Sequence, residues 1–311
     1  MTVAPSNAPA LDITCTTCGA DVVVQAGLRT TECPYCGSPH VVERPPHEDR
    51  PDPTFVVAFT VDHAAAQGIV KRWIGNRGPF VQAGIKRAVV EGTRGVYVPS
   101  YLYGARAHAR YSASIGENYT VTVTYTTTDS KGNTVVRTRT EVRTEWRSLS
   151  GVYDANVMDV LVTASRGLGN AELEAVEPFD LRLLQCYTPD LLAGWIAEEA
   201  SIAPEDCVKM AQGETRAGIE RELQGFMPGD SSTSLQTKIS LRDEVAHLAL
   251  LPVWIFVLRY AEDKDPIRIL INGQSGKVAG NVPFSAVRIA LAVILFLGLA
   301  AGLMLVLGVF A

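Results

Sequence analysis

Four of the six cysteines in this 311-residue chain form two CxxC pairs near the N-terminus, Cys15 with Cys18 and Cys33 with Cys36. Two intervening residues allow both thiolates of a pair to reach one ion from a tight turn, and four thiolates suit tetrahedral zinc. Four cysteine ligands leave no position for a catalytic water, so we expect a structural Zn²⁺. A redox role for a CxxC pair is the alternative, but two pairs at this spacing favour a metal.

The segment that carries these cysteines, residues 11–43, is predicted to be a rubredoxin-like zinc ribbon. Short strands are expected at residues 20–25 and 28–32, around a turn at Gly27. About 30 residues cannot bury enough core alone, so the metal would hold this mini-domain together. Four acids against two bases between residues 11 and 44 repel phosphate. A protein contact or a purely structural role is therefore favoured over DNA binding.

The C-terminal end carries a second strong signal, because residues 289–311 include no charged side chain. A helix over this run spans about 34 Å, enough for a hydrocarbon core of roughly 30 Å. We therefore predict a single C-terminal transmembrane helix that anchors the chain in the lipid bilayer. Lys277 and Arg288 lie on the N-terminal side of the run, and zinc thiolates need a reducing compartment. Both observations place the N-terminal domains in the cytoplasm.

Within this run, Gly298 and Gly302 form a GxxxG motif, which supports helix dimers in membranes. A homodimer through these glycines is one hypothesis. Glycine is also common in membrane helices that do not dimerise, so the motif alone does not decide between the two.

Between the two ends we expect a proline-rich linker at residues 44–53 and a mixed α+β body at residues 54–285. Four prolines in ten residues predict an extended linker, which would let the ribbon move away from the body. In the body, helices are predicted at residues 61–75, 190–201 and 203–226. Antiparallel strands are predicted at 55–60, 96–107, 118–128, 134–148, 235–241, 248–260, 267–271 and 277–279.

Two parts of the body share a pattern of residue types. Residues 98–103 and 251–256 both show an apolar residue, proline, a small or apolar residue, and then aromatic, aliphatic and aromatic residues. Each follows a predicted helix and leads into further strands. A duplicated helix-plus-meander unit is the structural hypothesis that follows.

The predicted hairpin of the body is cationic, with seven bases against four acids over residues 101–148. One interpretation is a face directed toward anionic lipid head groups. The other, which we favour because acids alternate with bases, is a solvated hairpin with cross-strand Arg–Glu pairs. Cys186 and Cys207 have no partner at motif spacing, and buried, unreactive thiols are the ordinary outcome for such residues.

The chain resembles a bacterial family with an N-terminal zinc ribbon, a shared middle region and a C-terminal membrane helix. The resemblance covers nearly the whole chain and rests on residues 15–39, 95–101, 159–165, 177–181, 192–198, 251–254 and 272–280. Such proteins are often labelled zinc-ribbon or primosomal-helicase-like. The resemblance implies this architecture, zinc and the bacterial inner membrane, but no reaction.

A helicase or ATPase function is excluded by the residues themselves. The nearest match to the phosphate-binding motif GxxxxGK[ST] is Gly276-Lys277, where Ile271 replaces the first glycine and Val278 the Ser/Thr. A net charge of −5 also argues against a strongly basic nucleic-acid binder. We therefore expect an adaptor that holds a protein partner at the membrane. An enzyme or redox device, with a site at Cys186 or Cys207, and membrane-tethered nucleic-acid binding are the alternatives.

Overall fold

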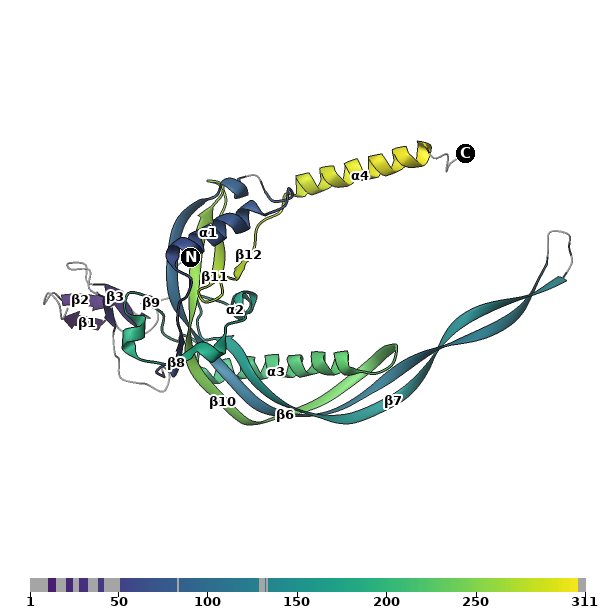
Figure 1. Ribbon diagram of the computed structural model, residues 1–311, viewed down its shortest axis with the longest axis horizontal. Coiled ribbons are helices and arrows are strands. Elements are labelled where there is room, and N and C mark those ends of the chain that lie inside the picture. Colours follow the sequence, from purple (N-terminus) through teal and green to yellow (C-terminus); the bar gives the residue numbers. More distant parts are fainter. Residues whose placement is uncertain are drawn as a thin grey trace. The chain divides into compact units, whose positions relative to one another are not determined.

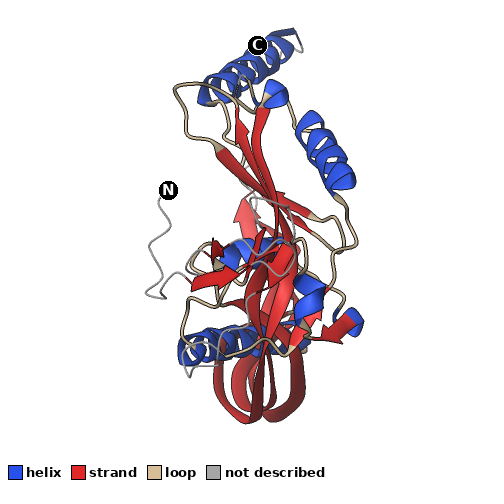
Figure 2. Cartoon of the chain, turned by 90° about the vertical axis from the view of Figure 1, so that its left-hand side faces the viewer, coloured by secondary structure: helices blue, strands red, loops and turns tan. Residues whose placement is uncertain are grey.

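The computed structural model describes residues 11–14, 21–24, 28–32, 39–41, 51–82, 84–128, 132 and 134–306. It is a mixed α+β fold with one large mixed sheet and four helices, drawn by secondary-structure type in Figure 2. The chain divides into two compact units. Unit 1 holds residues 1–101, 161–207 and 247–311, and unit 2 holds residues 102–160 and 208–246.

The elements follow one another along the chain as labelled in Figure 1. The helices are α1 (His63–Gly75), α2 (Asn170–Val176), α3 (Pro204–Phe226) and α4 (Ala286–Val306), with 3-10 turns η1 (Ile85–Arg87), η2 (Leu181–Leu183) and η3 (Pro189–Leu192). The large sheet holds β5 (Phe55–Val57), β6 (Val89–Thr128), β7 (Thr134–Thr163), β8 (Leu184–Cys186), β9 (Ile196–Ala197), β10 (Ser231–Arg259), β11 (Ile267–Asn272) and β12 (Val278–Gly280). Two separate hairpins are β1 (Leu11–Thr14) with β2 (Asp21–Val24), and β3 (Thr30–Glu32) with β4 (Pro39–Val41).

The core of unit 1 forms between α1 and the strands β10 and β11. Asp62 caps α1, and its carboxylate accepts the backbone N–H of Ala65 at 2.7 Å. Ala66, Val70 and Ile74, spaced by four residues, form the buried face of this helix. They pack into one cluster with buried residues of β10 and β11. The predicted helix and the predicted apolar strands therefore meet in one core.

The two segments that share a sequence pattern, around Pro99 and Pro252, have corresponding hydrogen-bonding neighbours in unit 1. The two residues just before the first segment pair in parallel with β9, and those just before the second pair in parallel with β5. The Pro99 carbonyl accepts the N–H of Ala164, which follows β7, at 2.9 Å. The Pro252 carbonyl accepts the N–H of Gly273, which follows β11, at 2.8 Å. The segments thus lie at equivalent positions of their strands.

Unit 2 is built on the β6–β7 hairpin that the alternating sequence predicts, although both strands are longer than expected. Its core contains Ile219 and Leu223 of α3, packed with Ala107 and Ala109 of β6. Helix α3 begins and ends within a residue of the predicted bounds. Phe226, the last residue of the helix, is exposed.

One predicted helix is wrong. Residues 190–201 form only the short turn η3, followed by β9. The threonine and proline before this segment do start a helical turn. The turn ends because Gly194 adopts a left-handed φ of 81° and the next residues join the sheet beside β6. Pairing with β6 therefore outweighs the local helical signal.

The N-terminal strands also differ in pairing from the expectation. Strand β2 pairs with β1 and β3 with β4, so the strands on either side of Gly27 do not pair with each other. The expected independence of the ribbon from the body is wrong at residues 28–30. The N–H of Arg29 donates to the Ala197 carbonyl at 2.9 Å, and the Thr30 hydroxyl accepts the Ala197 N–H at 3.0 Å. The start of β3 and the two residues before it are thus bound to β9.

Candidate functional site

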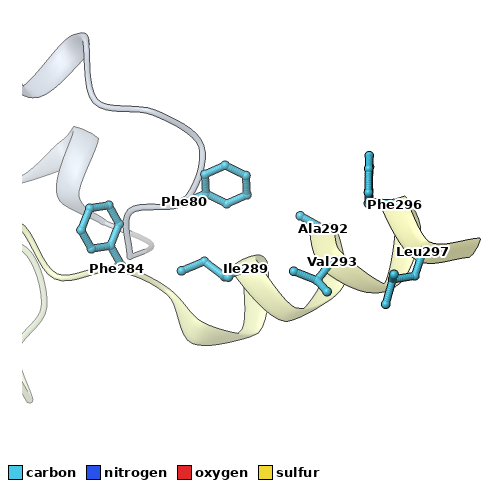
Figure 3. Close-up of a pocket in the computed structure, with 7 residues that line it drawn as sticks. All are labelled: Phe80, Phe284, Ile289, Ala292, Val293, Phe296 and Leu297. Atoms are coloured by element: carbon cyan, nitrogen blue, oxygen red, sulfur yellow. The ribbon is translucent and has the colours of Figure 1, made fainter. Parts of the chain in front are cut away.

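A groove lined only by apolar side chains lies at the start of α4. It has a volume of about 460 Å³. Phe80 and Phe284 form one end and α4 forms the rest, as Figure 3 shows. We call this the α4 collar, and its lining residues are Phe80, Phe284, Ile289, Ala292, Val293, Phe296 and Leu297.

The two phenylalanines of the collar are held by backbone pairing. The N–H of Ser285 donates to the Phe80 carbonyl at 2.7 Å, and Val81 and Phe284 form an antiparallel bridge. The Arg288 guanidinium donates to the carbonyls of Pro79 and Val81, at 3.0 and 2.9 Å. Both aromatic rings nevertheless remain accessible, with Phe80 41% and Phe284 67% exposed. Large exposed apolar side chains held rigidly beside one another are typical of a binding surface.

Helix α4 exposes apolar side chains around its circumference. Eight large apolar residues between positions 289 and 299 are at least 42% exposed. They are Ile289, Leu291, Val293, Ile294, Leu295, Phe296, Leu297 and Leu299. A helix that is apolar on all sides is normally covered by protein or lipid. Across the part of the chain that the structure describes, no helix is both long and apolar enough to span a membrane.

A polar centre in unit 1, separate from the apolar groove, joins segments on which the family resemblance rests. The Ser165 hydroxyl donates to the Glu198 carboxylate at 2.7 Å and accepts the N–H groups of Gly167 and Leu168, at 2.9 and 3.2 Å. Glu198 in turn donates its backbone N–H to the Tyr97 carbonyl. Burial raises the pKa of Glu198, and the bond from Ser165 opposes that shift. A hydroxyl engaged by two N–H groups and a carboxylate stabilises a turn and is a poor nucleophile.

Another polar centre of unit 1 is the turn after β11. Asn272 is fully buried, and its amide donates to the carbonyls of Val176 and Pro178 at 3.0 and 3.1 Å. Its side-chain oxygen accepts the N–H groups of Gln274 and Ser275, both at 2.9 Å. The turn between the predicted strands 267–271 and 277–279 therefore also binds the loop after α2. We call Asn272 and its four side-chain hydrogen bonds the clamp.

The loop that this turn binds also carries Glu177, whose side chain is half-buried. The Lys277 ammonium donates to the Glu177 backbone carbonyl. Burial and the neighbouring Glu174 raise the pKa of Glu177, while Lys277 lowers it. Glu177 and Glu198 are both half-buried and belong to structural turns. Among the described residues, no cluster of metal-ligand side chains is found beside either of them.

An aromatic cluster joins three segments of the resemblance, those that contain Gly95, Trp195 and Trp254. The rings of Phe59 and Trp195 stack at 3.9 Å with an interplanar angle of 5°. Trp254 meets both rings edge-on and donates its indole N–H to the Val61 carbonyl at 2.8 Å. Gly95 leaves the space that the two tryptophans fill. Segments far apart in the sequence thus meet because their aromatic residues form one core.

The predicted zinc ligands Cys15, Cys18, Cys33 and Cys36 lie outside the described residues. In the sequence, one pair falls in the connection between β1 and β2 and the other in the connection between β3 and β4. Each CxxC pair is therefore flanked by the two strands of an antiparallel hairpin.

The remaining cysteines differ in accessibility. Cys207 is fully buried, and its thiol lies 3.5 Å from the Thr163 carbonyl. Burial raises the pKa of Cys207 to about 11, so its thiolate is scarce at neutral pH. This argues against an enzyme that uses Cys207. Cys186 is exposed on β8, opposite Phe55 of β5.

The cationic hairpin carries ion pairs of the kind that the solvated interpretation predicts. Arg147 of β7 pairs with Glu117 of β6 across the strands. Glu141 accepts bonds from both Arg139 and Arg143, at 2.9 and 3.4 Å. These arginines lower the pKa of Glu141. Two acids thus pair with three arginines among the described residues of the hairpin.

Comparison with known proteins gives one distant homologue. The chain is 25% identical over 240 residues to the uncharacterised protein YdjG of Bacillus subtilis (strain 168). The alignment covers 76% of this chain and 66%, just under two thirds, of YdjG. No protein-family model matches the chain. No solved structure matches it either.

Proposed function

We propose that this protein is a membrane-anchored adaptor, with residues 289–311 in the bilayer and the folded units on the cytoplasmic face of the bacterial inner membrane. The observation that carries the proposal is the exposed apolar circumference of α4. The uncharged run continues through residues 307–311, which follow the described part of the helix. Over its whole length the run matches the thickness of a hydrocarbon core.

The α4 collar supports the same proposal. The last charge before the apolar run belongs to Arg288, whose guanidinium is bound to backbone carbonyls rather than placed on the apolar surface. Phe80 and Phe284 continue the apolar surface of α4 onto the body of unit 1. We infer that these two rings enter the interfacial region of the membrane, where aromatic side chains are favoured.

The N-terminal hairpins are proposed as the module that contacts a protein partner. Cys15, Cys18, Cys33 and Cys36 would hold a structural Zn²⁺, which supplies the stability that two short hairpins lack. Attachment of residues 28–30 to β9 gives this module a fixed base on unit 1. A partner bound there would be retained beside the membrane.

The anchoring part is tested by cell fractionation with carbonate washing. Val293→Arg combined with Leu297→Arg places two charges in the apolar run, where a charged side chain costs up to about 3 kcal/mol at the membrane centre and less toward either end. The wild type is expected in the carbonate-resistant membrane fraction and the double variant in the soluble or degraded fraction. Leu183→Arg, at a residue 55% exposed elsewhere on unit 1, is the matched control and should behave as the wild type. Equal fractionation of all three proteins would refute the anchor.

The adaptor part is tested by affinity purification from native membranes. The wild type is compared with a variant carrying Cys33→Ser and Cys36→Ser, and the co-purifying proteins are identified by mass spectrometry. A protein lost only from the variant, while the membrane fraction and tryptophan fluorescence stay unchanged, would support recognition by the ribbon. Identical co-purifying proteins in both samples would leave the ribbon a structural module and refute its role in recruitment.

A further inference from the structure

Strand β7 presents a long unpaired edge in unit 2. Among the described residues, it pairs with β6 and with no other strand. Nearly all side chains between positions 136 and 152 are exposed. An exposed edge of this length offers a row of free N–H and C=O groups to another strand. The side chains of β7 determine which strand can pair with this edge.

The two faces of β7 differ in chemistry. Odd-numbered positions from 137 to 147 carry Arg, Arg, Glu, Arg, Glu and Arg. Even-numbered positions carry threonine and apolar residues, among which Val136, Val142, Trp146 and Val152 are 48–68% exposed. Since side chains alternate between faces along a strand, a partner strand must match a charged row and an apolar row together.

We propose that the occupant of this edge is β7 of a second copy of the chain, paired antiparallel about a two-fold axis through Thr144. In this register Arg143 lies opposite Glu145 of the second copy, and Glu141 lies opposite Arg147, each twice by symmetry. No like charges between positions 137 and 147 oppose each other. Opposite charges at facing positions stabilise antiparallel pairs.

The other face fits the same register. Val142 lies opposite Trp146 of the second copy, and Val136 lies opposite Val152. Thr144 lies opposite its own copy. Aromatic with β-branched, and threonine with threonine, are favourable cross-strand pairs. Four side chains that are exposed in one copy would therefore be covered by the pairing.

The charge pattern also excludes the neighbouring registers. A shift by two residues in one direction opposes Glu141 with Glu145 and Arg139 with Arg147. A shift by two in the other direction opposes Arg143 with Arg147. A one-residue shift sets the charged row of one copy against the threonine row of the other. The sequence of β7 is thus self-complementary in one register and repulsive or mismatched in the adjacent ones.

The proposed interface is separate from Gly298 and Gly302, and from any partner of the ribbon. Arg143→Glu and Glu145→Arg test it as a complementary pair. When two identical variant chains pair, positions 143 and 145 of the two copies face each other with like charges. Both charges are negative in Arg143→Glu and both are positive in Glu145→Arg. When the two variants are mixed, both contacts regain opposite charges. Glu117 and Arg147, which pair within the hairpin, are untouched.

The experiment co-expresses two differently tagged full-length chains and measures how much of one tag is recovered with the other from detergent micelles. Two wild-type chains should co-purify. Two Arg143→Glu chains, or two Glu145→Arg chains, should associate about tenfold more weakly, and the mixed pair should recover. Arg137→Glu, which lies opposite Gly151, is the matched control and should have little effect. A mixed pair that fails to recover, or wild-type chains that do not co-purify, would overturn the proposal.

An intermolecular disulfide provides a second test. A Thr144→Cys chain brings two cysteines together at the axis, whereas Thr138→Cys places them about 40 Å apart. Oxidation should yield a disulfide-linked dimer of the first variant only. Equal cross-linking of the two variants would exclude this register. A Gly298→Leu chain, tested in parallel, should leave the cross-link at Thr144→Cys unchanged, since the glycine motif is a different contact.

Discussion

Replacement of Asn272 gives the sharpest test of how unit 1 is held together. Its side chain makes four hydrogen bonds to backbone groups, and the residue is fully buried. An alanine cannot replace any of these bonds. At a net value of about 1 kcal/mol for each bond, Asn272→Ala should lower the free energy of unfolding by about 4 kcal/mol.

Two neighbours in the same turn provide a graded series. The Gln274 side chain makes two bonds to the backbone of Asp180, at 2.6 and 3.1 Å, so Gln274→Ala should cost about 2 kcal/mol. Ser275 makes one long, exposed bond to Lys277, at 3.4 Å, so Ser275→Ala should cost less than about 0.5 kcal/mol. The expected order follows only the number and burial of the bonds.

Urea titration of the full-length chain in detergent, followed by tryptophan fluorescence, measures these differences. Three of the four tryptophans, Trp73, Trp195 and Trp254, belong to the cores of unit 1. The midpoints should shift at a constant slope, so that the shift reports stability. If Asn272→Ala lowers the free energy of unfolding by less than about 1 kcal/mol, or if Ser275→Ala lowers it equally, the hydrogen bonds of Asn272 do not hold unit 1 together as we infer.

Three further predictions address other parts of unit 1. Since the pKa of Glu198 is raised in the folded state, the folded carboxyl binds its proton more tightly than the unfolded one, and stability should fall as pH rises from about 4.3 through the raised pKa. In urea titrations of Glu198→Gln this fall should be smaller than in the wild type, and a remainder is expected because the pKa of Glu177 is raised as well. Site-resolved mass spectrometry after alkylation at neutral pH should find native Cys186 modified and Cys207 unmodified, and modification of both before unfolding would contradict the buried position of Cys207. Gly95→Ala should cost about 1–3 kcal/mol in the same urea titration, because a Cβ there would lie 2.7 Å from the Trp195 ring, and an unchanged midpoint would mean that the aromatic cluster yields.

Much of the fold follows from local patterns in the sequence. Helix α1 carries a cap and regular apolar spacing, helix α3 has acidic residues in its first turn, and the β6–β7 hairpin alternates strongly around a polar turn. The apolar second half of strand β10 could be predicted because a short, continuous apolar run is typical of a buried strand. These elements form largely where the sequence predicts them because their signals are complete within a short window.

The polar centres could not be predicted, because each depends on residues far apart in the chain. Nothing near Ser165 indicates that its partner is Glu198, and nothing near Asn272 indicates that it binds the loop after α2. The α4 collar was missed for the same reason. Phe80 lies 204 positions before Phe284, and backbone pairing between their segments brings the rings together. The signal that could have found it is the proline before each of these two phenylalanines.

The parallel pairing of β5 with β10 also limits the order in which the chain can fold as it is synthesised. Strand β5 pairs with β10, so Phe55 and Val56 must wait for partners made nearly 200 residues later. All residues of unit 2 lie between positions 102 and 246, and they are complete before those partners are made. Unit 2 can therefore fold first, while the sheet of unit 1 closes only when the second half of β10 and then β11 follow. Until then β5 can pair with β8 but lacks its β10 neighbour, and the buried face of α1 lacks the β10 and β11 residues against which it packs. This early segment is therefore the part of the nascent chain that most needs protection from aggregation.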